Sequence, residues 1–210
     1  LSEELNFNMM FSQRGVMNLA HNEHDIKEMK RRISANRLNG LDTQWIDTKQ
    51  IKELVPIMNT ENLRYPVLGA AFQPRGGVAR HDAVAWGYAL RSNEMGVDII
   101  HNCEVKDIKT DNYKVEGVNT SKGFIKANKI AVVASGHTSI LAQTAGVKLP
   151  LQSRPLQALV SEPIKPVINT VVMSNAVHAY ISQSDKGELV IGAGTDGYNS
   201  FTQRGGYDVI

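Results

Sequence analysis

The first part of the chain, residues 1–80, contains both strand-like and helix-like hydrophobic patterns. Apolar and polar residues alternate around Gln13-Arg14-Gly15, as expected for two strands joined by a turn. Ile26, Met29 and Ile33 recur at helical spacing and would share one face. The elements predicted here are a two-stranded hairpin over residues 5–20, helices over 22–35 and 47–55, a strand over 44–46, and a loop-rich stretch over 57–80.

The second part begins with a helix signal and ends with strand signals. Asp82 is a residue type that caps helices and Gly96 one that follows their ends, so a helix is predicted between them. The segment 129–134 is almost entirely apolar, which is typical of a buried parallel strand. The further elements predicted are strands over 97–100, 104–108, 115–120 and 123–127, a short helix after 135–139, and antiparallel strands over 156–162, 170–174, 178–182 and 189–193.

These elements predict a mixed α/β fold. Helix–strand units occupy the middle of the chain, and antiparallel segments lie on both sides of them, so we expect two interleaved domains. The predicted boundaries leave residues 1–75 and 151–210 to one domain and residues 76–150 to the other.

Composition and charge exclude several functional classes. The net charge of the 210 residues is only +2 at pH 7, and no basic run points to nucleic acid. The single cysteine, Cys103, allows no internal disulfide and favours a reducing, cytoplasmic compartment. No run of about 18 apolar residues is present, so no membrane span is predicted. Because the chain opens at Leu1 rather than at methionine, we expect an internal fragment.

Two segments place polar or small residues where a ligand could bind. The apolar run over 130–134 ends in Ser135-Gly136, which either admits a ligand to the backbone or only forms a tight turn. His178 alternates with Tyr180, so both would face one side of a strand. That pair either lines a cavity or forms a cross-strand pair facing solvent. His21, His24 and His101 are expected to have surface or packing roles, and His137 to cap a turn. No metal site is predicted.

His81 is the histidine whose position most suggests chemistry. It follows a flexible Gly76-Gly77 approach and lies beside Arg80 at the predicted start of a helix. The free N–H groups and the dipole at a helix start favour anions and tend to keep an imidazole neutral. Such a position would suit a phosphorylated cofactor, covalent attachment or proton transfer.

Long stretches of the sequence resemble the β subunit of heterotetrameric sarcosine oxidases, a group of FAD-dependent amine oxidoreductases in the D-amino-acid oxidase and monomeric sarcosine oxidase superfamily. The resemblance includes Gly-Gly-Val-Ala-Arg-His-Asp-Ala-Val-Ala-Trp-Gly and covers essentially the whole chain. The stretches that carry it are 6–15, 76–87, 95–105, 134–139, 154–163, 172–175 and 186–194.

The resemblance implies two flavins. FAD would be bound noncovalently in a glutathione-reductase-type dinucleotide fold, interleaved with an antiparallel-sheet substrate domain and incomplete at both ends of this chain. FMN would be joined through its 8α-methyl carbon to His81, beside Arg80. The residues that match FAD contacts are Val105, Ala134, Ser135 and Gly136. Residues 76–150 would then be part of the FAD-binding domain, and residues 1–75 and 151–210 parts of the substrate domain.

The resemblance also implies a reaction. Sarcosine would be oxidised at its N–CH3 bond by hydride transfer to FAD, giving an imine that yields glycine. The methyl carbon would leave as formaldehyde or be captured by tetrahydrofolate in a partner subunit, and electrons would pass through FMN to oxygen to form hydrogen peroxide. His178 matches a substrate-pocket histidine, and Tyr180 is added on geometry as a second catalytic candidate.

Partners and rivals complete the sequence interpretation. The implied partners are the α, γ and δ subunits. The GxGxxG strand and a C-terminal lysine segment of the family have no counterpart in the chain, so we expect the fragment by itself to be inactive. One rival is a single-flavin N-methyl amine or amino-acid oxidase or dehydrogenase. A rival of another class is a non-catalytic scaffold subunit or a degenerate paralogue.

Overall fold

A computed structural model describes residues 1–61 and 63–202 of the chain. The described residues form two compact units: unit 1 comprises residues 1–92 and 157–194, and unit 2 comprises residues 93–156 and 195–202. The chain therefore passes from unit 1 to unit 2, back to unit 1 and again into unit 2. The predicted domain boundaries lie at 75/76 and 150/151, and their functional assignment stays a prediction.

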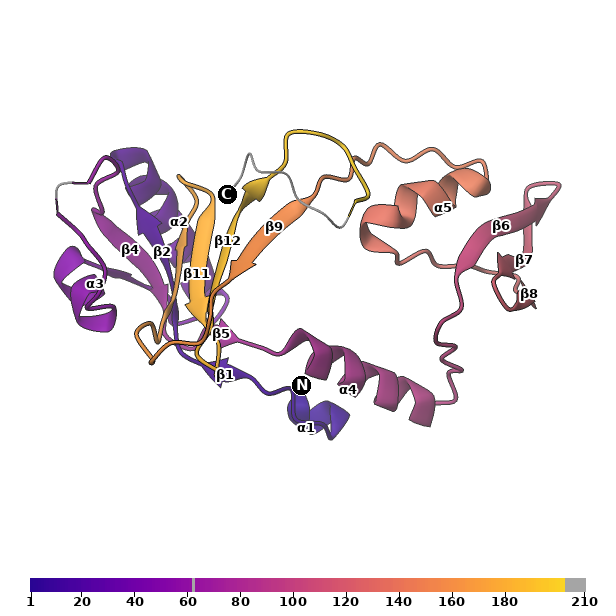
Figure 1. The fold of residues 1–210 in the computed structure, drawn as a ribbon, viewed down its shortest axis with the longest axis horizontal. Coiled ribbons are helices and arrows are strands. Elements are labelled where there is room, and N and C mark those ends of the chain that lie inside the picture. Colours follow the sequence, from indigo (N-terminus) through magenta and orange to yellow (C-terminus); the bar gives the residue numbers. More distant parts are fainter. Residues whose placement is uncertain (62, 203–210) are drawn as a thin grey trace. The chain divides into compact units, whose positions relative to one another are not determined.

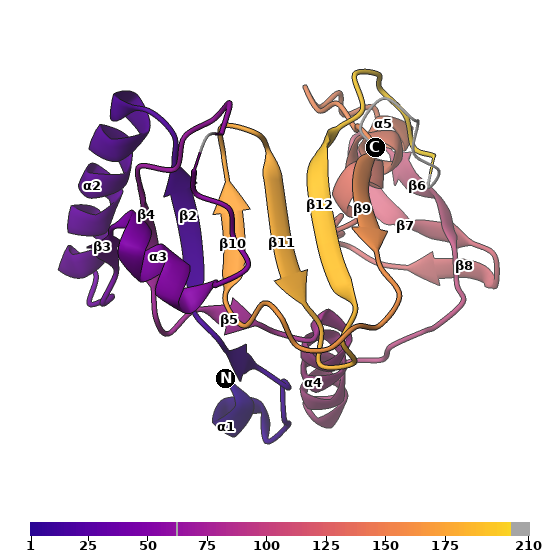
Figure 2. The same cartoon turned by 60° about the vertical axis from the view of Figure 1, so that its left-hand side comes forward.

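Unit 1 is built on a seven-stranded mixed sheet with the order β3-β4-β2-β10-β11-β12-β9 (Figure 2). Neighbouring pairs from β3 to β12 are antiparallel except β2 and β10, which run parallel. A separate two-stranded ladder joins β1 to β5. The strands are β1 (Ser12–Gln13), β2 (Val16–Ala20), β3 (Gln44–Ile46), β4 (Gly69–Gln73), β5 (Gly77–Val78), β9 (Leu156–Val160), β10 (Val171–Ser174), β11 (Ala179–Gln183) and β12 (Leu189–Thr195).

Alternating residues of the central strands bury apolar side chains on both faces of the sheet. Met17, Leu19 and Phe72 pack on one face against the helix α3 (Thr48–Leu54). Ala20 and Ala71 pack on the other face against the helix α2 (Glu23–Leu38). Because strand side chains alternate between faces, this pattern fixes the register of β2 and β4.

Local capping explains why the two helices begin where the sequence predicts. The Asn22 side chain accepts from the backbone N–H of Asp25 and caps α2. Asp47 and Gln50 form a reciprocal capping box at α3. The predicted helices over 22–35 and 47–55 are confirmed, although α2 extends to Leu38.

The predicted hairpin over residues 5–20 is wrong. Strand β1 pairs with β5, and β2 pairs with β4 and β10. The backbone N–H groups of Arg14 and Gly15 both donate to the carbonyl of Gly76, so the turn is tied to a distant segment.

The loop predicted over 57–80 in fact contains β4 and β5. Their glycines and alanines gave no strand pattern, but small residues fit there: a Cβ at Gly69 would lie 2.2 Å from the Trp45 ring.

Unit 2 contains a three-stranded antiparallel meander and a short helix (Figure 1). The meander confirms the strands predicted over 104–108, 115–120 and 123–127. A 3-10 turn precedes the helix and follows an extended segment. The elements are β6 (Val105–Asp111), β7 (Lys114–Thr120), β8 (Gly123–Lys126), the turn Ser135–His137 and α5 (Thr138–Thr144).

The strands predicted over 97–100 and 129–134 do not form. Neither segment has a strand partner within the described residues, and the side chain of Val133 is 93% exposed. A parallel strand needs neighbours to satisfy its backbone groups, and no described segment supplies them. An apolar run therefore shows which side chains a strand would bury, but it does not show that neighbouring strands are present to pair with it.

Two further helices, α1 (Ser2–Leu5) and α4 (His81–Glu94), lie before and after strands of unit 1 in the chain. Helix α1 precedes the sheet, and α4 follows β5. The predicted helix over 82–94 is confirmed with its start moved to His81. Among the described residues, no helix is long and apolar enough to cross a bilayer. Within the same residues, no group of three histidine, cysteine, aspartate or glutamate side chains could hold a metal ion.

Candidate functional site

His81 occupies the first residue of α4 and is exposed. Its ring makes no hydrogen bond with the described residues, so its ring nitrogens remain available. The helix is held to unit 1 through small residues, because a Cβ at Gly87 would lie 2.4 Å from Cε of Met9. The histidine is therefore presented on a helix whose buried contacts lie elsewhere on its surface.

The glycines before His81 are required by packing rather than by flexibility. A Cβ at Gly77 would lie 2.0 Å from the backbone oxygen of Ser12 in the paired strand β1. A Cβ at Gly76 would lie 2.8 Å from Val16 Cγ2. The expectation of a flexible approach is thus wrong: close backbone contact fixes the path of the chain into α4.

Arg80 is already paired. Its guanidinium binds both oxygens of Asp82 in a fork, with Nε 3.1 Å from Oδ1. The Asp82 carboxylate also accepts from the backbone N–H of Ala83. An anion at this helix start would have to compete with Asp82 for the charge of Arg80.

The stability that the Arg80–Asp82 pair contributes is expected to depend on pH. The hydrogen bond from Arg80 lowers the pKa of the Asp82 carboxyl below its ordinary value, and the Ala83 N–H adds to the effect. A depressed folded pKa means that the pair stabilises the fold above about pH 3.9 and is lost as the pH falls through the folded pKa. A carbon-detected NMR titration should show the lowered value, and Arg80→Gln should raise it. An Asp82 pKa that is unchanged in Arg80→Gln would refute the pairing.

His178 and Tyr180 come from one hairpin but not from one strand. His178 ends the turn between β10 and β11 with φ of 50°, and β11 begins at Ala179. The prediction that both residues face one side of a strand is therefore wrong, because His178 belongs to the turn. Tyr180 pairs with Met173 and Gly192, and its ring lies across Gly192, where a Cβ would be 2.0 Å from Tyr180 Cε1.

His21 contacts this hairpin beside its turn. Its Nε2 lies 2.7 Å from Ser174 Oγ, and its Nδ1 lies 3.1 Å from the carbonyl oxygen of Pro66. Ser174 pairs with Ala179, the residue after His178. The contact joins residues 153 positions apart, so no local sequence pattern could have revealed it. The expected packing role of His21 is therefore specific: it ties the end of β10, just before the turn that carries His178, to the start of the segment after β2.

The structure separates the two predicted histidine sites within unit 1. Strand β5, which leads into α4, pairs with the segment just before β2 begins. Strand β10 runs parallel to β2 and turns into the His178 loop beyond the end of β2. Figure 2 shows β5 and the β10–β11 connection at opposite ends of the sheet. His81 and His178 are therefore not brought together.

The predicted FAD contacts lie in unit 2, where Val105 and Ala134 line one apolar cavity of about 220 Å³. Backbone groups of residues 130–133 make no hydrogen bond with the described residues. Ser135 has φ of 47°, and the Gly136 carbonyl accepts from Ser153 Oγ at 2.6 Å. An apolar slot beside unpaired backbone amides and carbonyls suits a flat heteroaromatic ring with donors and acceptors on its edge. The other lining residues are Ile108, Val118, Ile130, Ala131, Val132, Val133 and Leu141.

Comparison with known sequences identifies the relatives of this chain. Residues 1–209 match the family described as FAD dependent oxidoreductase. The chain is 56% identical over 211 residues to the sarcosine oxidase subunit beta of Arthrobacter sp., covering all of this chain and 52% of that protein. It is 55% identical over 207 residues to the sarcosine oxidase subunit beta of Rhodobacter capsulatus, covering 99% of this chain and 50% of that protein. The chain spans about half the length of the curated relatives it matches.

A solved structure agrees with this relationship. The crystal structure of L-proline dehydrogenase from P. horikoshii superposes with a TM-score of 0.84 at 29% sequence identity. The match covers 96% of this chain and 53% of that chain. The predicted fold class, a mixed α/β flavoenzyme fold of this type, is confirmed.

Proposed function

Because this chain belongs to the FAD-dependent oxidoreductase family, we propose that it acts as part of a sarcosine oxidase β subunit. The observation that carries the proposal is the identity of 56% that extends over the whole chain. The reaction would be oxidative demethylation of sarcosine to glycine, with formaldehyde or 5,10-methylenetetrahydrofolate and hydrogen peroxide as further products. In this reaction FAD, when bound, accepts the hydride.

We propose that unit 2 contributes to the FAD site. Val105 would contact the adenine of FAD, and Ala134, Ser135 and Gly136 would form a second stretch in contact with FAD. Two residues that are 29 positions apart line one cavity, and this convergence supports the assignment. Unit 1, with its large antiparallel portion, would supply the substrate side.

His81 is proposed as the covalent anchor of FMN. Support comes from its exposed ring, whose nitrogens have no partner among the described residues. Arg80 is assigned to the phosphate or the electron-rich edge of FMN, in competition with Asp82. His178 and Tyr180, at the other end of unit 1, are proposed to bind the sarcosine carboxylate at FAD. Their separation from His81 fits a protein in which two flavins have different tasks.

The name of the relatives, subunit beta, implies a multi-subunit assembly, and we propose α, γ and δ partners in a cytoplasmic heterotetramer. Tetrahydrofolate would be bound by a partner subunit. The single cysteine supports a reducing compartment.

The proposal is tested with the full-length subunit assembled with its partners. We expect sarcosine, added without oxygen, to bleach the flavin absorbance, and admission of oxygen to release hydrogen peroxide. His178→Asn should raise KM for sarcosine by about tenfold or more while the FAD content stays constant. Glycine, which lacks the N-methyl group, is the control. A flavin-loaded assembly that sarcosine does not reduce would reject the reaction and leave the scaffold alternative.

A further inference from the structure

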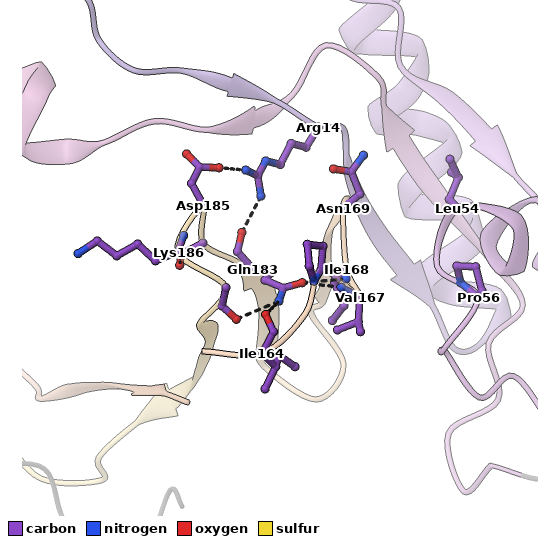
Figure 3. Close-up of a pocket in the computed structure, with 13 residues that line it drawn as sticks. Arg14, Leu54, Pro56, Ile164, Val167, Ile168, Asn169, Gln183, Asp185 and Lys186 are labelled. Carbon is purple, nitrogen blue, oxygen red and sulfur yellow. Dashed lines mark hydrogen bonds and ion pairs between the residues drawn. The ribbon is translucent and has the colours of Figure 1, made fainter. Parts of the chain in front are cut away.

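A second cavity lies wholly within unit 1 and has no part in the proposed reaction (Figure 3). Its volume is about 530 Å³, within the range of small-molecule sites in proteins. It contains none of the residues assigned above to flavin or sarcosine. The lining residues are Arg14, Leu54, Pro56, Ile164, Pro166, Val167, Ile168, Asn169, Gln183, Ser184, Asp185, Lys186 and Gly187.

The cavity has an apolar wall and a polar end. Figure 3 shows Leu54 and Pro56 across from the segment that contains Val167 and Ile168. Arg14 and the amide of Asn169 lie at the polar end. Such a division orients a ligand that has one polar group on an apolar body.

The apolar wall is held rigidly by one buried side chain. Gln183 is 4% exposed, and its Oε1 accepts from the backbone N–H groups of Val167 and Ile168 at 2.8 and 3.1 Å. Its Nε2 donates to the carbonyls of Lys165 and Gly187 at 3.1 and 2.9 Å. A wall fixed in this way does not have to be ordered when a ligand binds, which lowers the cost of binding.

Arg14 brings a positive charge to the polar end, where an anion would compete with Asp185 for it. The Arg14 side chain is 17% exposed, and it donates to Ser12 Oγ, to the Gln183 carbonyl and to Asp185. Three of its five N–H groups are thereby used, and two remain. Its counter-ion Asp185 is 75% exposed, so water already screens that partner. The Asn169 amide has no hydrogen-bond partner among the described residues and can donate alongside Arg14.

We propose that this cavity binds a monocarboxylate with a compact apolar body. The carboxylate meets Arg14 and Asn169, and the apolar body lies against Leu54, Val167 and Ile168. Sarcosine does not fit this description, because it has no apolar body to lie against the wall. The site is therefore a second ligand site, independent of the proposed reaction.

The test is calorimetric titration of the full-length subunit, assembled with its partners, with 3-phenylpropionate. The neutral isostere 3-phenyl-1-propanol is titrated in parallel. We expect millimolar or tighter binding of the carboxylate and binding of the alcohol that is weaker by about tenfold or more. Equal binding of the two compounds, or no carboxylate binding at millimolar concentrations, would overturn the proposal.

Variants that are expected to change the carboxylate affinity in opposite directions locate the site. Arg14→Gln and Asn169→Leu should each weaken carboxylate binding, the first by about tenfold or more. Asp185→Asn should tighten it, because the competing charge is removed. Val167→Trp should abolish it by filling the cavity. Lys27→Gln is the control, because Lys27 is an exposed cation on α2 and does not line the cavity. If Arg14→Gln does not fold, the Asp185, Asn169 and Val167 variants still decide: unchanged affinity in all three would reject the site.

Discussion

Replacing His81 with alanine is expected to abolish covalent flavin in the assembled protein while leaving the fold and the FAD content intact. The physical reason is that His81 supplies only an exposed imidazole at the start of α4. The buried contacts of that helix are made by Ala83 and Gly87. Loss of the ring therefore removes a bond-forming nitrogen without removing packing.

The measurement is mass spectrometry of the denatured and digested full-length subunit, coexpressed with its partners. The peptide that contains His81 should carry the mass of FMN in the wild-type protein and none in His81→Ala. His24→Ala is the matched control, because His24 is likewise exposed in the first turn of a helix. An unmodified His81 peptide from a folded, FAD-loaded assembly would reject the tether and favour a single-flavin enzyme.

Replacing Gln183 with leucine is expected to destabilise unit 1 by about 3 kcal/mol. Leucine has a similar size but can make none of the hydrogen bonds of the amide. The backbone N–H groups of Val167 and Ile168 would lose their acceptor, and the carbonyl of Gly187 would lose a donor. Buried backbone groups without partners carry their full desolvation cost.

Urea unfolding of the purified protein measures this effect. Gln73→Leu provides a matched control, because Gln73 Oε1 is buried without a hydrogen-bond partner among the described residues. Removing an unsatisfied acceptor should be neutral or slightly stabilising. A Gln183→Leu midpoint equal to the wild-type midpoint would show that the loop over 164–169 is not held by this amide.

Local patterns predicted much of the secondary structure. Asn22 and Asp47 start their helices because capping depends on residues three or four positions away. The meander of β6, β7 and β8 also followed from alternation and turn residues within one short stretch. His81 was likewise placed correctly at the start of a helix, because the helical pattern follows it directly, although Asp82, the predicted cap, is itself the second residue of α4.

Patterns that depend on distant partners were less informative. The apolar runs over 97–100 and 129–134 predict strands only if neighbouring strands exist, and the described residues contain none. Strand β4 was missed because Gly69, Ala70 and Ala71 are small, and at Gly69 the reason for the small residue is the Trp45 ring packed against it. The turn position of His178 depends on the length of the loop that β10 and β11 leave between them.

By itself the sequence determined the helices, the antiparallel meander, the mixed α/β class and the family resemblance, because these depend on local spacing and on residue identity. Only the tertiary structure decided that β1 pairs with β5 and that His81 and His178 lie at opposite ends of the sheet. It also brought Arg14 to Asp185 across 171 positions and so formed the second cavity. Such contacts arise from the burial of side chains that meet only when strands from both ends of the chain join one sheet.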